Sequence, residues 1–140
     1  MTAAQYTLAT HLDHLKQFIK KLEHYQEMVD KKRFLSDQMA QDAILKALEQ
    51  ITEATITIAT MIIAQCGFRK AENNEELFVI LAEEKIYPRK FAEQLKGIGG
   101  FRNILVHDYI NINLELVYRN LQKGLPLFKK FARYIARFLA

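Results

Sequence analysis

One nine-residue stretch, from Phe101 to Tyr109, gathers side chains that could act on a phosphate. Histidine titrates near neutral pH, so His107 could take a proton from a nucleophile and return one to a leaving group. Arg102 offers a fixed fork of donors that matches phosphate oxygens, and Asn103 could orient either group. These groups suffice to cleave RNA without a metal ion, because the ribose 2′-hydroxyl can attack its own phosphate while arginine stabilises the developing charge. By spacing alone, a structural histidine near a solvated arginine is the commoner arrangement.

Helical geometry separates the polar and apolar residues of this stretch. On an ideal helix about 160° of arc holds the polar side chains, which are Arg102, Asn103, His107 and Tyr109. A separate stripe that would anchor the helix to a core holds Ile98, Phe101, Ile104 and Leu105. Asp108 falls within the apolar stripe, so we expect the helix to end or distort near His107. Because Arg102 and His107 lie about 140° apart, joint action requires that distortion or a second copy of the motif facing the first.

Other candidate chemistries have less support. No acid or cysteine pattern completes a metal site around the three histidines of the N-terminal region, His11, His14 and His24. Glu49 and Glu53 are four residues apart and could pair as carboxylates, but we interpret them as an exposed helix face near Lys46. The sequence therefore predicts no metal ion and no cofactor.

Two long amphipathic patterns supply the frame that must position the stretch. Apolar residues recur at three- and four-residue steps over residues 4–30, which predicts one helix with one buried face. A basic break follows at 31–33. Ser36 or Asp37 can then cap a second helix of roughly 28 residues that ends at Gly67. Its near-heptad apolar spacing invites packing along its whole length and hints at a dimer.

Shorter helices and one long one complete the chain. A short helix is expected after a capping asparagine at 73–74, and another with Pro88 in its first turn ends at Gly97. The last apolar pattern covers 114–138, with Pro126 marking a kink or restart. The patterns together predict an all-α, up-and-down bundle of about five helices in one domain, residues 1–140.

Composition agrees with this fold class. The 140 residues are 50% apolar and 26% charged, with only five Gly and two Pro, so there is little turn chemistry for a sandwich or barrel. The longest uncharged run, Ala54 to Phe68, is shorter than the ~20 residues of a membrane span. No secretory signal is recognisable, and the single Cys66 excludes an internal disulfide. We therefore expect a cytoplasmic protein.

The net charge of +4 is unevenly distributed. The segment after Glu115, residues 116–140, contains no acid. It carries six cations, Arg119, Lys123, Lys129, Lys130, Arg133 and Arg137. A field of one sign attracts phosphates or an acidic partner surface, but cations near a helix C-terminus are also favourable as a merely solvated face.

The segment from Arg102 to Tyr109 resembles the signature of the HEPN superfamily, an Arg followed by four to six residues and a His. Asn103 directly after the Arg, and Tyr109 two places beyond the His, make it similar to the HepT-type toxin branch. The likeness extends over roughly residues 8 to 130, including the segments 48–54 and 96–101. Thr52 departs from the pattern, since relatives often carry Gly there.

This resemblance implies a fold, an activity and a partner. HEPN toxins are all-helical homodimers whose two motifs face one another in a cleft, and they are metal-independent endoribonucleases. Arg102 and His107 match the catalytic positions, and Asn103 matches the supporting one. HepT-like toxins are paired with a minimal nucleotidyltransferase antitoxin, MntA, which transfers AMP to the tyrosine that Tyr109 matches, giving O-AMP-tyrosine. Anionic nucleotides beside Arg102 would occupy the phosphate site and repel RNA.

A second class of function stays open. The same helical fold could serve as a non-catalytic adaptor, or as the nucleotide-binding subunit of a nucleotidyltransferase, with Arg102 and His107 only clamping phosphate. Toxicity on overexpression and the fate of bound RNA would separate the two. The sequence does not indicate which RNA is cut.

Overall fold

A computed structural model describes the backbone of residues 2–107 and 109–140, and the side chains of these residues except 99, 100, 106, 107 and 109. Within these ranges the chain forms helices and no strands. In chain order they are α1 (Ala3–Met28), α2 (Lys31–Ser36), α3 (Gln38–Cys66), α4 (Asn74–Glu83), α5 (Arg89–Gln94), α6 (Ile98–His107), the 3-10 helix η1 (Tyr109–Asn111) and α7 (Leu114–Leu139). The all-α prediction is confirmed, but seven α-helices replace the expected five or so.

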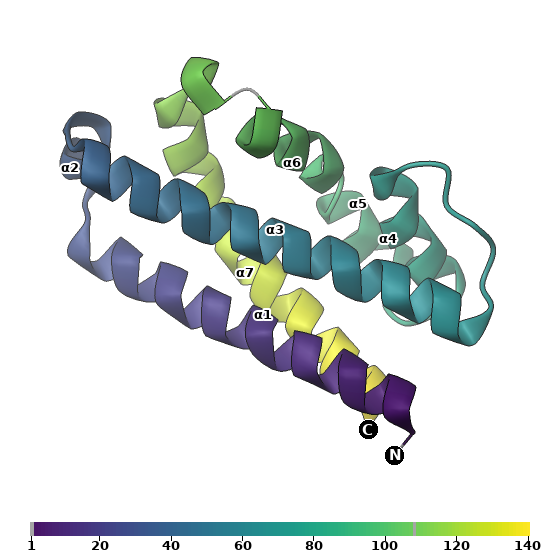
Figure 1. The fold of residues 1–140 in the computed structure, drawn as a ribbon. Helices are drawn as coiled ribbons and strands as arrows, with labels where there is room; N and C mark the ends of the chain where they lie inside the picture. Colours follow the sequence, from purple (N-terminus) through teal and green to yellow (C-terminus); the bar gives the residue numbers. More distant parts are fainter. Residues whose placement is uncertain (1, 108) are drawn as a thin grey trace.

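Helices α1 and α3 run antiparallel side by side, and α7 crosses behind them (Figure 1). The buried stripe of α1 is the expected one, consisting of Leu8, Leu12, Leu15, Ile19 and Leu22. Thr2 and Gln5 form a capping box at its start. Asp37 caps α3, accepting from the backbone N–H of Met39 at 2.9 Å, and Gly67 ends it in the left-handed conformation.

Helix α3 is the centre of the bundle and packs against α1, α2, α4, α6 and α7. By length and composition alone it could cross a membrane, yet half of its most apolar window is buried inside the protein. The length of this helix hinted at packing against a second chain. Helices of the same chain cover much of it instead. Thr52 on this helix is fully buried, and its hydroxyl has no hydrogen-bond partner among the described residues.

The basic run at 31–33 does not break the chain as expected but forms the first half of α2. Asp30 caps this helix by accepting from the backbone N–H of Arg33 at 2.8 Å. Phe34 is fully buried, and its ring lies 5.8 Å from that of Tyr118 on α7. One buried aromatic is too little for a periodicity signal, so the sequence pattern missed this element.

An aromatic cluster ties α4 and α5 to α7. Tyr87 packs against the rings of Phe91, Phe131 and Tyr134 and donates a 2.9 Å hydrogen bond to the carbonyl of Phe78. Burial raises the pKa of the Tyr87 phenol well above its usual range.

Helix α5 is shorter than expected at both ends. Pro88 is its N-cap rather than a first-turn residue, and the helix ends at Gln94, before Gly97. Gly97 has a φ of 97°, which a residue with a Cβ rarely adopts, and it leads directly into α6.

Helix α7 runs without interruption through Pro126, so of the two expected outcomes, a kink or a restart, the restart is wrong. Pro126 is exposed, and the buried stripe continues past it from Leu125 to Phe128 and on to Ile135. Packing of this continuous stripe holds the helix together across the hydrogen bond that a proline cannot donate.

Candidate functional site

Helix α6 carries the candidate site and packs on α3 and α4. Leu105 is buried, and Ile98 and Phe101 pack partly buried against the core, as the apolar stripe predicted. Ile104 departs from the prediction of a buried stripe. It is 43% exposed, because it lies at the edge of that stripe on the helix. The helix ends at His107, where the misplaced Asp108 predicted an end or distortion.

Arg102 is held on two sides by hydrogen-bond acceptors. Its Nε donates to Oε1 of Glu53 on α3 at 2.5 Å, and its Nη1 donates to Oδ1 of Asn103 at 3.5 Å. The Arg102 side chain is 33% exposed and that of Glu53 is 41% exposed. The arginine is therefore oriented by a carboxylate and still reached by solvent.

This arrangement leaves part of the guanidinium available. No partner of Nη2 of Arg102 lies among the residues whose side chains are described. A guanidinium binds phosphate through a fork of parallel N–H donors, and Glu53 occupies only the Nε position. With respect to the described residues, Nη2 of Arg102 is therefore unpaired, and the neighbouring Asn103 is exposed.

Glu53 is the functional residue that spacing did not identify. Glu49 lies near Lys46 as predicted, since Nζ of Lys46 is 3.8 Å from the Glu49 carboxylate. Glu53 instead pairs with a residue 49 positions away, a separation that no local periodicity reports. The only signal in the sequence is that Glu53 lies in the 48–54 segment through which the chain resembles HEPN proteins.

Of the predicted site residues, the structure brings Arg102 and Asn103 together. His107 is the last residue of α6, and Tyr109 is the first residue of η1, but their side chains lie outside the described part of the chain, as does Asp108. The expected approach of His107 and Tyr109 to the arginine therefore stays a prediction.

Three large apolar residues close to the motif in the chain are exposed. Ile104 on α6, Ile110 in η1 and Leu116 in the first turn of α7 are 43%, 94% and 48% exposed. All three lie within residues 104–116.

The histidines of α1 do not form a metal site with other described residues. His11 and His14 contact one another edge to face, with ring centroids 6.1 Å apart. Within the described part of the chain, no group of three or more His, Cys, Asp or Glu side chains is arranged to hold a metal ion.

Comparison with known proteins connects this site to an activity. Residues 15–135 match a protein family described as ribonuclease HepT-like. The mRNA nuclease HepT of Shewanella oneidensis is 32% identical over 117 residues, covering 84% of this chain and 86% of that protein. The tRNA nuclease HepT of Aphanizomenon flos-aquae is 29% identical over 132 residues, covering 94% and 84%.

Solved structures show the same fold. The tri-AMPylated HEPN toxin of Shewanella oneidensis, in complex with its MNT antitoxin, superposes with a TM-score of 0.83 and 28% identity over 98% of this chain and 99% of that one. The cytosolic protein YutE of Bacillus subtilis, with 18% identity, gives a TM-score of 0.81 over 94% and 89% of the two chains. At that identity the likeness concerns the fold alone.

Proposed function

Because this chain belongs to the ribonuclease HepT-like family, we propose that it is the toxin of a toxin–antitoxin pair and a metal-independent endoribonuclease. The observation that carries the proposal is the Arg102 guanidinium, oriented by Glu53 and Asn103 with donors left for a phosphate. Its relatives are named as nucleases of mRNA and tRNA, so RNA is the substrate class.

The proposed reaction uses the ribose 2′-hydroxyl as the nucleophile. His107 takes the proton of this hydroxyl, the bond from O2′ to phosphorus forms, and the bond from phosphorus to O5′ breaks. Arg102 stabilises the negative charge that develops on the phosphate oxygens in the transition state. The O5′ leaving group needs a proton, which a second histidine can give. The products are a 2′,3′-cyclic phosphate and a 5′-hydroxyl.

A homodimer would supply that second histidine. One copy of the chain has a single His107, whereas two motifs facing each other provide a base and an acid. The exposed Ile104, Ile110 and Leu116 beside the motif would then become buried between the copies. Replacing Ile110 by Asp, which places a charge where an apolar contact is expected, should give a monomer in sedimentation and abolish cleavage. A dimer that persists would place the interface elsewhere.

The central experiment is cleavage of RNA in the presence of a metal chelator, followed by analysis of the ends. We expect cyclic phosphate ends from the wild type, and a rate about 10²- to 10⁴-fold lower for His107→Ala, as for removal of a general acid–base group. His24→Ala is the matched control, because it removes an exposed histidine from α1. Undiminished cleavage by His107→Ala, or dependence on a metal, would contradict the proposal.

Tyr109 is the proposed site of control by the partner. A solved relative is tri-AMPylated in complex with an MNT antitoxin, and we extend this to transfer of AMP onto the Tyr109 hydroxyl by an MntA-like nucleotidyltransferase. The added phosphates would lie a few residues from Arg102 and compete with RNA for its donors. Both proteins would act in the cytoplasm, where RNA and nucleotides are available.

Intact mass after co-expression with the nucleotidyltransferase tests this control. Wild-type protein should gain mass in whole AMP units, and Tyr109→Phe should gain none. Tyr6→Phe is the control, because Tyr6 is 64% exposed and far along the chain. AMP mass that persists on Tyr109→Phe would assign another acceptor. Overexpression that leaves growth unaffected, with bound RNA intact, would favour the non-catalytic adaptor or nucleotide-binding subunit instead.

A further inference from the structure

The outer face of α7 carries a row of cations that the proposed site does not use. On an ideal helix they fall within about 80° of arc and extend over about 27 Å. The row consists of Arg119, Lys123, Lys130, Arg133 and Arg137, all exposed. We call it the α7 row. Five of the six cations of the expected basic field therefore lie on one side of one helix.

The α7 row is not neutralised by the protein itself. Within the described part of the chain, none of its members forms an ion pair with a carboxylate. Lys129, which lies off the row, shows the contrast, because its Nζ binds Glu23 at 2.5 Å. A face of five cations without acids among them attracts a polyanion.

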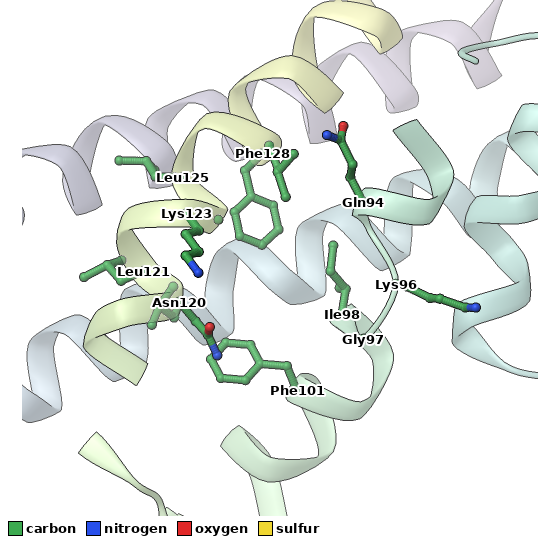
Figure 2. A pocket seen from close by; sticks show the side chains of 13 residues that line it. Gln94, Lys96, Gly97, Ile98, Phe101, Asn120, Leu121, Lys123, Leu125 and Phe128 are labelled. Carbon is green, nitrogen blue, oxygen red and sulfur yellow. The ribbon is translucent and has the colours of Figure 1, made fainter. Parts of the chain in front are cut away.

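A cavity of about 280 Å³ opens beside the α7 row, between α7 and the turn from α5 into α6. Figure 2 shows Phe101 of α6 and Phe128 of α7 on two sides of it. The amides of Gln94 and Asn120 are part of its lining. Lys123 belongs both to this lining and to the α7 row, so the cavity and the row form one continuous surface.

Aromatic walls beside a row of cations fit single-stranded nucleic acid. Proteins bind such strands by holding the backbone phosphates with cations and by receiving bases on aromatic side chains. Apolar walls with a few polar groups suit a small flat ring, whose edge the two amides could meet. An acidic protein surface would satisfy the row but would leave the apolar cavity unexplained.

We propose that this cavity receives one base of a single-stranded RNA while the α7 row binds the phosphates on one side of that base. The inference rests on the proposed ribonuclease function, for which it defines a second contact with substrate. Phe101 directly precedes Arg102, so the cavity and the guanidinium lie on adjacent faces of α6. A strand held in the cavity is thereby brought close to the proposed reacting phosphate.

The salt dependence of RNA binding tests the α7 row. Binding is measured in the His107→Ala background, so that RNA stays intact. The test variant carries Gln in place of four row cations, Arg119, Lys123, Lys130 and Arg133. It should bind RNA more weakly, and the slope of log K against log salt should fall by roughly 0.7 for each phosphate that a cation no longer neutralises. The matched control changes exposed cations of equal number away from the row, namely Lys16, Lys20, Lys32 and Lys70. Its slope should stay close to that of the parent.

Filling the cavity tests the base contact separately. A Cβ added at Gly124 would lie 3.7 Å from the Phe128 ring, which is ordinary contact, so a side chain can be introduced there. Gly124→Leu should place its branched end in the cavity and weaken binding about tenfold with an unchanged salt slope, as for removal of one stacked base. Gly124→Ala, which adds only a methyl group, is the control for the altered helix backbone.

Substrate length separates this inference from the proposed function. A dinucleotide reaches only the reacting phosphate, so the four-Gln variant should cleave it at the wild-type rate while cleaving a long single strand more slowly. Equal weakening in the row variant and the control variant, or unchanged RNA binding in both, would overturn the inference. If wild-type protein cleaves neither substrate but the row still governs binding, the ribonuclease proposal fails and the RNA surface stands.

Discussion

Arg69 and Arg102 both bind carboxylates in this protein, and they do so differently. Arg69 is fully engaged: its Nε and Nη2 donate to the two oxygens of Glu83 at 2.9 and 2.8 Å, and its Nη1 binds Glu76. Arg102 has one carboxylate, Glu53, on Nε and a long contact to Asn103. The first guanidinium fixes the segment after α3 to α4, whereas the second has one charged partner among the described residues.

The difference shows how the same side chain serves structure or chemistry. Two carboxylates give the Arg69 cluster a net negative charge and use each nitrogen of the fork, so phosphate gains nothing there. Among the described residues a single carboxylate pairs with Arg102, so that pair is neutral and Nη2 has no partner there. The two arginines therefore differ in how many of their donors the described carboxylates occupy.

The largest expected effect comes from changing the shape of the Arg102 cation. Arg102→Lys keeps the charge but removes the fork, so the single-turnover cleavage rate should fall about 10²-fold or more, as for removal of a transition-state donor. Arg69→Lys, the matched change, should leave the rate unaltered. Comparable rates for the two variants would remove the distinction drawn between the arginines.

Glu53 should act as a positioning residue, with a smaller effect. Glu53→Ala frees the guanidinium to rotate, and misplacement of a catalytic group by about 1 Å can cost up to 10²-fold in rate. Glu53→Gln keeps an oxygen acceptor for Nε and should recover most of kcat, which a merely structural role would not require. Glu83→Gln is the control at the other arginine, and an equal fall in rate there would contradict the assignment.

The ion pairs of Arg69 should instead make the stability of the fold depend on pH in the acid range. Hydrogen bonding from Arg69 lowers the pKa of the Glu83 carboxyl below its usual value. A carboxyl whose pKa is lower in the folded state contributes stability that is present above its unfolded pKa of about 4.3. That contribution disappears as the pH falls through the folded pKa.

Thermal melts of wild type and Arg69→Gln across this range test the linkage. The variant should melt a few degrees lower at neutral pH, and the gap should shrink toward zero in acid, while cleavage of RNA at neutral pH stays unchanged. A difference in melting temperature that grows as the pH falls would contradict this linkage.

The smallest effect is expected in the core beside Glu53, where Thr52 carries a buried hydroxyl that lacks a partner in the described structure. Thr52→Val has nearly the same shape and removes that group, so the free energy of unfolding should rise by about 1 kcal/mol. Denaturant unfolding measures this change. Cleavage should persist, because the Glu53–Arg102 pair remains. A decrease in stability would mean that the hydroxyl is satisfied.

Much of the fold could be predicted from residue order. Periods of three and four, the capping residues Asp37 and Asn73, and Gly67 identify the long helices and the start of α4, because helix formation and its termination are local. The pattern failed for α2 and for the restart at Pro126. In both places distant packing, of Phe34 against Tyr118 and of the continuous α7 stripe, decides the outcome.

The sequence by itself determined which residues could do chemistry, since Arg102, Asn103 and His107 share one short helical segment and their types fix the reactions open to them. Only the tertiary structure decided that Arg102 meets Glu53, that Ile104 faces solvent, and that Phe101 and Lys123 border one cavity. Such contacts join residues far apart in the chain. Their distances depend on how α3, α6 and α7 pack, which periodicity within any single helix does not encode.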